Sequence, residues 1–440
     1  MSITFVDLFS GIGGFHAVGS SLGWTGVYAA DIDKHASKIY ENNWGLNSYA
    51  DLTVDASEQH MAVPKHDVLF AGFPCQPFSK GGHQRGMDEA RGTLFWNIAN
   101  IVQKRKPKMV ILENVRNLSG PRHVHEWEVI IKTLRDLGYL VSDDPLLSSP
   151  HKISPEFGGR PQHRERIYIN ATYVPPNMRS KQSLVADKLT IENISSNWNP
   201  KDWKLIQDLP VENRLSKDEL LKLSMTEDEI NWVETWEDFL SQFIRKNKGS
   251  ILPGFPLWAD VWLGNLKLSK DFPEWKLDFV RKNREFYDQN RSFIDVWLRK
   301  NNFLESFPSS RRKFEWQAQD SVSIWDCLVQ FRPSGLRIKK LNYVPAAVAI
   351  TQTPVVGPMK RRLSVREVAR LQGLPEHFSF EGQDMKHSYK QLGNGISVAS
   401  AFHSVLAHIE RDADILKKTL PSTLETLNAS HKNPDFLLNL

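Results

Sequence analysis

Short apolar runs alternate with amphipathic stretches over the first 175 residues of the chain. The amphipathic stretches carry apolar residues at three- and four-residue spacing, which predicts helices after Gly13, Asp33, Arg91 and His123. Strands that alternate with helices pair in parallel through right-handed crossovers, so the pattern predicts a doubly wound α/β sheet covered on both faces. The runs that predict its strands are ITFVDLF (3–9), TGVYAAD (25–31), HDVLFAGF (66–73), PKMVILEN (107–114) and ERIYINAT (165–172).

The pattern changes between residues 176 and 345. Ten of the fourteen tryptophans fall in this region, among Lys, Asn and Pro residues and without a strand–helix alternation, which predicts a separate domain. The tryptophans of WADVWL (258–263) and FIDVWL (293–298) recur at helical spacing. We therefore expect them to pack inside that domain rather than to form stacking platforms.

Clear helix signals return towards the C-terminus. Ser364 and Glu367 form the S-x-x-E pattern of a capping box, and Gly373 followed by Pro375 ends the predicted helix. The segment SVASAFHSVLAHI (397–409) predicts an amphipathic helix, and residues 411–440 predict a polar C-terminal tail.

The composition narrows the class of protein. A chain of 440 residues is long enough for about two or three domains. Its only cysteines, Cys75 and Cys327, cannot build a disulfide framework, and no Cys/His cluster has metal-ligand spacing, so we expect a reducing compartment and no metal. The N-terminal segment carries Asp7 and does not resemble a leader peptide, and the chain has no apolar run of about 18 residues. These two features predict a cytoplasmic protein with no membrane partner.

The net charge of +5 is mildly basic, and basic residues cluster in the second half of the chain. The clusters are RKNR (281–284), RRK (311–313), RIKK (337–340) and KRR (360–362). Such runs form solvated faces more often than nucleic-acid contacts, so both interpretations stay open.

Chemically distinctive residues lie at or just after the ends of four of the predicted strands. They are the turn 9–14, Asp31, the segment 72–75 and the pair 113–114. Ligands bind beyond the carboxyl ends of parallel strands, so a glycine-rich turn, two acids and a thiol would open on one rim. Each feature also has a simpler interpretation. The turn FSGIGG does not fit G-x-G-x-x-G and can be purely structural, and Asp31 can cap the next helix. Glu113 can be a surface acid, and Cys75 can be a small buried residue. Their collection at one edge favours a site.

Seven motifs then occur in one order: DLFSGIGGF (7–15), the acid of AADID (29–33), AGFPCQPFS (71–79), ENV (113–115), QHRER (162–166), RRLSVREVARLQGLP (361–375) and QLGNG (391–395). Over about 1–172 and 345–410 the chain resembles the DNA cytosine-5 methyltransferases of bacterial restriction–modification type. The resemblance implies a Rossmann-like domain that uses S-adenosylmethionine, and a smaller target-recognition domain. It also implies methyl transfer to carbon 5 of a flipped cytosine in a specific duplex DNA sequence.

The resemblance assigns roles to single residues. In the S-adenosylmethionine site, Asp31 would bind the ribose hydroxyls and Asp51 the adenine. The cofactor-binding residues are Phe9, Gly11, Gly13, Asp31, Asp51 and Asn394. Cys75 would be the nucleophile and Glu113 would hold ring nitrogen 3, while Arg164 and Arg166 support the base and the acid. The residues of the base pocket are Pro74, Gln76, Ser79 and Asn114.

Two details of these motifs lead to further expectations. The link that precedes QHRER is one residue longer than is usual in the family, with Arg160 as the extra residue. The two arginines of QHRER lie on a predicted strand, and we expect only one of them to face the pocket. The loop 80–92, which contains four glycines at 81, 82, 86 and 92, would close over the flipped base.

Methyl transfer to carbon 5 of cytosine independently requires the same residue types. Carbon 5 of cytosine is a poor nucleophile, so a thiolate must first add at carbon 6 while an acid at ring nitrogen 3 lets the ring accept charge. A free cysteine is mostly protonated at neutral pH, so positive charge near Cys75 should help. The two prolines beside Cys75 stiffen the backbone that carries the thiol.

The resemblance also divides the chain. Residues 1–175 would form the catalytic domain, completed by about 385–410, and residues 176–384 the target-recognition domain, whose variable part is 176–345. Arg332 and Arg337 in FRPSGLRIKK are candidate base or phosphate contacts, because arginine pairs bidentately with guanine. The basic clusters predict that DNA binding weakens steeply with salt.

The expected partners are duplex DNA and a cognate restriction endonuclease, for a monomer in the bacterial cytoplasm associated with the nucleoid. Two alternatives stay open. One is a transfer-RNA cytosine-5 methyltransferase on the same fold, which the large variable domain argues against. The other is a catalytically silent DNA-binding protein, which the presence of Cys75, Glu113 and the arginine pair argues against.

Overall fold

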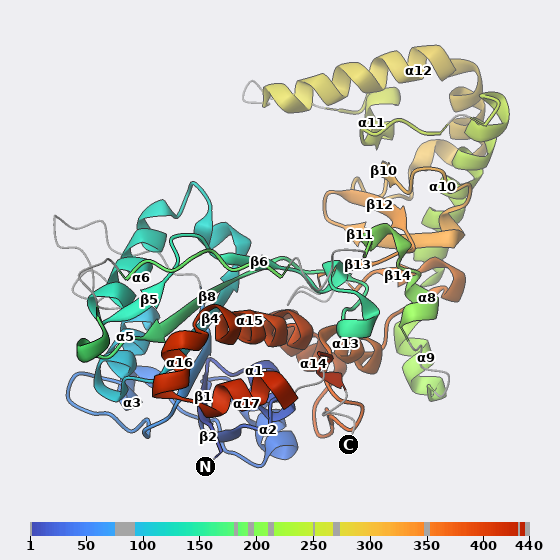
Figure 1. Ribbon diagram of the computed structural model, residues 1–440. Helices are drawn as coiled ribbons and strands as arrows, with labels where there is room; N and C mark the ends of the chain where they lie inside the picture. Colours follow the sequence, from blue (N-terminus) through green and yellow to red (C-terminus); the bar gives the residue numbers. More distant parts are fainter. Residues whose placement is uncertain are drawn as a thin grey trace.

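A computed structural model describes residues 2–74, 93–179, 184–191, 198–209, 215–249, 251–266, 273–346, 353–429 and 432–435. The predicted residues Cys75, Gln76 and Ser79 and the loop 80–92 lie outside the described residues. Figure 1 shows two bodies side by side: a first body that contains both ends of the chain, and a second body from which the long helix α12 projects.

The first body is built on a sheet of seven strands among the described residues, in the order β2-β1-β3-β4-β8-β5, with β6 also paired to β8. The strands are β1 (Thr4–Leu8), β2 (Thr25–Ala30), β3 (Val68–Gly72), β4 (Met109–Val115), β5 (Tyr139–Val141), β6 (Leu146–Ser148) and β8 (Arg166–Tyr173). Strands β1 to β4 pair in parallel, which confirms the predicted doubly wound α/β core.

The direction of β8 corrects the prediction of an all-parallel sheet. Strand β8 runs antiparallel to β4, β5 and β6. The chain leaves β4 at the carboxyl rim, crosses the sheet through α6 (Val124–Asp136) and returns to the rim through β5 and β6. Because β8 starts at that rim, the residues that precede it lie beside the carboxyl end of β4, where an all-parallel sheet would not bring them.

Both faces of the first sheet are buried, as the near-continuous apolar strands require. Phe5 and Phe70 pack into one core, whereas Val6 and Leu69, the next residues along the same strands, pack into the core on the opposite face. Helices α1 (Gly14–Ser21), α2 (Lys34–Trp44) and α15 (Val398–Arg411) contribute to the first core, and α3 (Leu52–Asp55), α5 (Leu94–Arg105) and α6 to the second. The four predicted N-terminal helices are confirmed.

Helix α15 is buried more completely than the expected amphipathic pattern implies. It packs against α1 and β8 and is also contacted by α16 (Ala413–Thr419) and α17 (Ser422–Ala429). These two helices fall in the predicted polar tail, and Leu416 and Thr423 within them are buried. The apolar face that the sequence assigns to α15 is therefore only part of its covered surface.

The second body has its own sheet and its own core. The sheet order is β15-β14-β11-β12-β10-β9, with β10 parallel to β12 and the other pairs antiparallel. Its strands are β9 (Leu257–Trp258), β10 (Lys313–Gln317), β11 (Cys327–Arg332), β12 (Gly335–Lys340), β14 (Val355–Val356) and β15 (Arg361–Arg362). Helices α10 (Glu227–Lys246), α11 (Ala259–Trp262) and α12 (Glu274–Lys300) pack on it, and Trp236, Trp262 and Trp297 fill the core. The expectation that WADVWL and FIDVWL pack internally is confirmed.

Short elements join the two bodies. Strand β7 (Gln162–His163) pairs with β13 (Val344–Pro345), so the QHRER segment touches the chain that leaves the second body. Helix α13 (Val365–Gln372) starts at the predicted capping box of Ser364 and Glu367 and ends at Gly373. In the part of the chain that the structure describes, the remaining α-helices are α8 (Leu205–Asp208), α9 (Lys217–Leu223) and α14 (Met385–Asn394). Within the described ranges, none of the helices is both long and apolar enough to cross a membrane.

Candidate active site

A cavity of about 600 Å³ opens at the carboxyl rim of the first sheet. It lies beyond the ends of β1 to β4 and is closed on another side by α14 and the residues that follow it. Ten of the predicted site residues line it: Phe9, Gly11, Asp31, Asp51, Pro74, Glu113, Asn114, Arg164, Arg166 and Asn394. Residues at the carboxyl ends of β1 to β4 therefore line one continuous cavity, as the sequence predicts.

The turn after β1 shapes the first wall of this cavity. Phe9, Gly11 and Gly13 have φ angles of 54°, 52° and 91°, in the left-handed region that favours glycine. Gly13, which was predicted to bind the cofactor, is not among the residues that line the cavity. A Cβ at Gly13 would come within 2.1 Å of the Trp44 indole nitrogen, which donates to the Ile12 carbonyl oxygen. Gly13 thus allows α1 and α2 to approach each other.

Asp31 lies at the end of β2 and supports this turn. Its Oδ2 accepts from the Gly11 amide and its Oδ1 from the Asp33 amide, both at 2.8 Å. The cap of α2 is Asp33, so the alternative interpretation of Asp31 as that cap is wrong. Burial raises the pKa of Asp31, while the two amide hydrogen bonds lower it. Asp51 caps α3, with its Oδ1 accepting from Thr53.

Apolar residues complete the same half of the cavity. Ile32 follows Asp31 and is 73% exposed, and Leu52 and Ile396 also line the wall. An exposed isoleucine next to the half-buried Asp31 carboxyl gives a surface that is apolar on one side and hydrogen-bonding on the other. The sequence analysis missed these residues and Lys390, although Ile32 and Ile396 directly follow motif residues.

Glu113 at the end of β4 occupies the other half of the cavity. Its Oε1 lies 3.0 Å from Nε of Arg166, and the two side chains are 10% and 18% exposed. Burial raises the pKa of the Glu113 carboxyl, although Arg166 and Arg164 both pull it down. The site therefore holds a carboxyl group that keeps its proton more readily than a surface glutamate does.

Arg164 and Arg166 both line this cavity, so the expectation that only one faces it is wrong. They are two positions apart, and alternate residues of an extended chain share a face. Arg164 is nearly fully buried, and its Nη2 donates to the carbonyl oxygens of Gly393 and Gly395 at 3.0 and 2.5 Å. Burial lowers the pKa of Arg164 to about 10. Arg164 thereby ties the QLGNG segment to the wall beside Glu113.

Asn114 and Arg160 act on the surrounding backbone. Asn114 Nδ2 donates to the Phe73 carbonyl oxygen at 2.8 Å, which holds the end of β3 just before Pro74. Arg160, the extra residue before QHRER, donates to the Arg370 carbonyl oxygen and to both carboxylate oxygens of Asp435. The added residue therefore anchors this link to the end of α13 and to the C-terminal segment.

A doubly wound sheet with a glycine turn, a carboxyl group after β2 and a buried acid near the end of β4 is the arrangement of an α/β enzyme whose ligand cavity opens at the carboxyl rim of the sheet. Comparison with known proteins identifies the family. The model of the C-5 cytosine-specific DNA methylases matches residues 3–410. The chain belongs to this family, whose members transfer a methyl group to carbon 5 of cytosine in DNA. The transfer-RNA alternative is therefore not favoured.

Individual relatives agree with this family. The chain is 40% identical to the Type II methyltransferase M.AluI of Cellulosimicrobium cellulans, over 97% of this chain and 95% of that protein. It is 29% identical to M.BanI of Aneurinibacillus aneurinilyticus, over 90% and 94% of the two chains. Similarity to M.HhaI of Haemophilus parahaemolyticus, at 40% identity, covers 38% of this chain and 48% of that protein.

Proposed function

We propose that this protein takes a methyl group from S-adenosylmethionine and transfers it to a cytosine everted from duplex DNA, with Cys75 as the covalent nucleophile. The observation that carries the proposal is the Glu113 carboxyl, whose pKa burial raises and which pairs with Arg166 in a cavity that also contains Pro74. Pro74 directly precedes Cys75 in the sequence.

The cofactor half of the cavity suits S-adenosylmethionine. Added Cβ atoms at Gly11 would meet nothing within 4 Å, so the turn leaves open space beside Asp31. We assign the ribose hydroxyls to Asp31, the adenine to Asp51 with exposed Ile32 beside it, and the remaining wall to Phe9 and Asn394. When bound, the group supplies a methyl on a positively charged sulfur.

The base half of the cavity then prepares the cytosine. Cys75 Sγ adds to carbon 6, and the ring electrons gain density at carbon 5 as the S–C6 bond forms. Glu113 holds a proton at ring nitrogen 3, which neutralises the charge that the addition places on the ring. After carbon 5 has gained its methyl group, a solvent base takes the carbon 5 proton. The electron pair of that C–H bond re-forms the C5–C6 double bond as the S–C6 bond breaks, which returns the thiolate, and ring nitrogen 3 returns its proton to Glu113.

The two arginines position this chemistry. Arg166 holds the Glu113 carboxylate from one side, so a single carboxyl oxygen is directed to the base. Arg164 places positive charge next to Glu113 and fixes the segment that carries Asn394. Asn114 holds the backbone before Pro74, so it orients the segment that bears the thiol. Gln76 and Ser79 are proposed to contact the everted base.

We assign duplex recognition to residues 176–384. The mixed sheet and tryptophan core of this region form a scaffold separate from the catalytic cavity, which suits a target-recognition role. The similarity to a Type II methyltransferase along 97% of the chain supports a role in a restriction–modification system with a cognate endonuclease. We expect a monomer that acts on DNA of the nucleoid in the bacterial cytoplasm.

The two cysteines of the chain provide a matched test of the nucleophile. Duplex DNA that contains 5-fluorocytosine traps the adduct, because fluorine at carbon 5 cannot leave as a proton does. We expect a stable protein–DNA adduct with the wild-type protein and with Cys327→Ser, whose cysteine is buried at the start of β11. Cys75→Ala should form no adduct and transfer no methyl group while it still binds the cofactor. An adduct in Cys75→Ala, or methyl label found only in RNA, would refute the proposal.

A further inference from the structure

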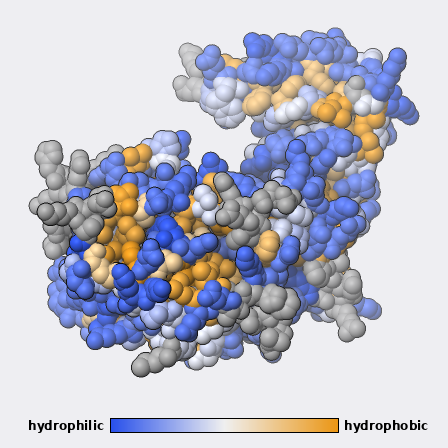
Figure 2. Space-filling model, viewed as in Figure 1, coloured by the Kyte–Doolittle hydropathy of each residue, from blue (hydrophilic) through white to orange (hydrophobic). Residues whose placement is uncertain are grey.

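The β11–β12 hairpin presents one face to the core of the second body, and its opposite face is polar except for the buried Leu328. Its register pairs Gln330 with Arg337 and Leu328 with Lys339, and side chains alternate along each strand. Leu336 and Ile338 point into the core of the second body, so Arg337 and Lys339 of the same strand point away from it. In the space-filling view, the visible surface of the second body below α12 is mainly hydrophilic (Figure 2).

Arg337 on this face is held from behind by an acid of the neighbouring strand. Its Nε donates to Oε2 of Glu315 at 2.7 Å, across the parallel β10–β12 pair that sets the two residues opposite each other. The other oxygen of Glu315 accepts from Gln317 Nε2. Among the described residues, the terminal nitrogens of Arg337 have no hydrogen-bond partner, although its side chain is only 28% exposed. The Glu315 contact therefore orients the guanidinium and leaves its two terminal nitrogens available to a ligand.

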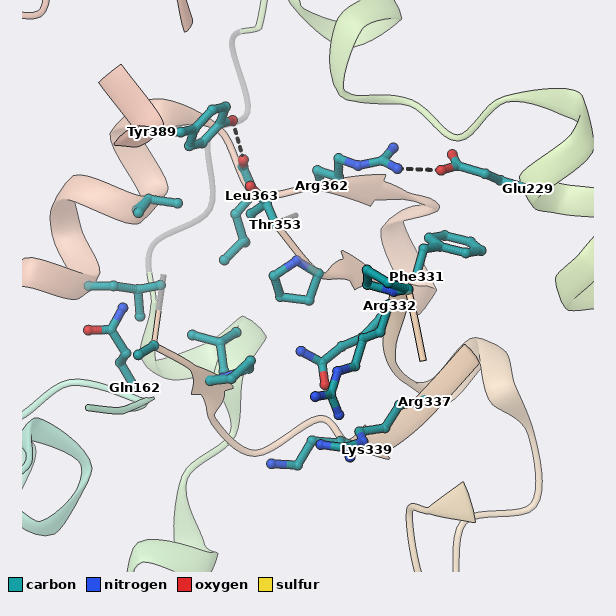
Figure 3. A pocket seen from close by; sticks show the side chains of 18 of the residues that line it. Gln162, Glu229, Phe331, Arg332, Arg337, Lys339, Thr353, Arg362, Leu363 and Tyr389 are labelled. Atoms are coloured by element: carbon teal, nitrogen blue, oxygen red, sulfur yellow. Dashed lines mark hydrogen bonds and ion pairs between the residues drawn. The ribbon is translucent and has the colours of Figure 1, made fainter. Parts of the chain in front are cut away.

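The residues next to Arg337 leave positive charge unmatched. Arg332 accepts a hydrogen bond at its carbonyl oxygen from Arg311, whereas its buried Nη1 has no partner among the described residues. Figure 3 shows Arg332, Arg337 and Lys339 extending from the two strands into one hollow. Burial and the nearby Arg337 charge lower the pKa of Lys339. Such a cluster suits an anionic or acceptor-rich ligand.

The hollow continues towards the active site. Arg332 and Arg337 line two neighbouring cavities, of about 620 and 480 Å³. The larger one is also lined by Gln162 of β7, two residues before Arg164 of the catalytic cavity. A nucleic-acid duplex is long enough to reach from one site to the other, and it offers both negative charge and hydrogen-bond acceptors to the basic side chains of the hollow.

We propose that Arg337 reads a guanine in the duplex that flanks the methylated cytosine, and that Glu315 is the positioning residue that orients it. The two terminal amino groups of an arginine match O6 and N7 of guanine in the major groove. The Nε contact with Glu315 leaves that fork free and fixes its plane, which reduces the freedom lost on binding. Arg332 and Lys339 flank it as phosphate contacts. The assignment rests on the proposed function.

Because Glu315 is negatively charged, its removal has different expected effects on DNA binding with and without a role in orienting Arg337. An acid that faces DNA repels the phosphates, so its removal should strengthen binding to every sequence if the acid has no further role. If Glu315 orients Arg337, its removal should instead abolish the preference for one guanine. The two explanations therefore predict different outcomes for a single substitution.

The experiment first maps methylation by the wild-type protein on duplexes with randomised flanks, using bisulfite sequencing. We then compare Arg337→Lys, which keeps the charge but loses the fork, with Glu315→Gln. We expect both variants to lose preference at one and the same guanine position by about tenfold or more, the discrimination that a bidentate pair provides. Preferences at the other positions should remain. Arg281→Lys and Asp278→Asn, from an exposed arginine–carboxylate pair on α12, serve as controls and should change no position.

Competition binding keeps the test decisive if a variant loses turnover. Duplexes that carry the mapped sequence, or one base-pair change at each position, compete for the full-length protein. Equal discrimination at every position by the wild type, Arg337→Lys and Glu315→Gln overturns the assignment, as does a uniform loss at all positions. Absence of methylcytosine in any DNA treated with the wild type would instead refute the proposed function, and the inference with it.

Discussion

The two bodies of the molecule each contain an arginine–glutamate pair that joins neighbouring strands through the arginine Nε. In the first body, Arg166 of β8 meets Glu113 of β4 at 3.0 Å, and in the second, Arg337 of β12 meets Glu315 of β10 at 2.7 Å. The acids differ in setting: Glu113 is 10% exposed inside the cavity, and Glu315 is 19% exposed on the outward face of a sheet. The surroundings of a pair therefore indicate which partner is available for function.

Burial explains the difference between the pairs. Around Glu113 the loss of solvent disfavours the charged carboxylate, so its pKa rises and the acid becomes the proton-holding partner. On the outward face, both Glu315 oxygens are occupied by Arg337 and Gln317, and the terminal nitrogens of the arginine are the groups left for a ligand. In the proposed roles, one local motif thus serves acid chemistry in one body and base recognition in the other.

The largest expected effect comes from removal of the buried acid. Glu113→Gln keeps the shape of the side chain but cannot supply a proton, so we expect the turnover number to fall by about 10²- to 10⁴-fold, the usual contribution of a general acid. Methyl transfer to a cognate duplex measures this loss. Retained cofactor binding would exclude unfolding as its cause.

A matched control tests whether the removal of a carboxylate outside the cavity also lowers the turnover number. Glu376→Gln breaks a pair with Arg370 of α13, in which the arginine Nε lies 2.7 Å from the carboxylate. The Glu376 side chain is 56% exposed on the loop that follows α13. We expect unchanged turnover in this variant. If Glu113→Gln kept a turnover close to that of the wild type, the Glu113–Arg166 pair would have no catalytic role that distinguishes it from the Glu315–Arg337 pair.

The pH dependence gives a smaller but directional effect. An acid with a raised pKa is protonated below that pKa and ionised above it, so activity that needs protonated Glu113 should decline as pH rises through the raised pKa. Arg166 lowers this pKa, and Arg166→Gln should therefore move the falling limb of the kcat/KM profile to higher pH. A limb that stays in place or moves to lower pH would contradict the assigned role of Arg166.

The sequence predicted the parallel half of the first sheet because β1 to β4 are apolar runs followed by strong helix signals. It did not predict the direction of β8, since that direction depends on β5 and β6, which are three residues each and carry too little pattern to recognise. The placement of both rim arginines follows from that direction. Family resemblance identified them without this geometry.

The site was predictable where a residue follows a strand and carries a charge or a glycine. It was not predictable where the function depends on register. Glu315 and Arg337 are 22 positions apart and meet only because β10 lies parallel to β12. The wall residue Ile32 has an ordinary apolar sequence signature, and only its 73% exposure in the fold distinguishes it from a core residue.

The smallest expected effect separates the phosphate contacts from the base-reading arginine. Lys339 lies beside Arg337 but lacks a planar fork, so Lys339→Ala should weaken binding to cognate and non-cognate duplexes by the same factor. The slope of log K against log salt should fall in magnitude by about 1, because one fewer phosphate is neutralised. Lys132→Ala, whose lysine pairs with Asp136 on α6 in the first body, should leave the slope unchanged. If Lys339→Ala altered the preferred sequence and kept the salt slope, Lys339 would be a base reader, and the division of roles on the hairpin would have to be reversed.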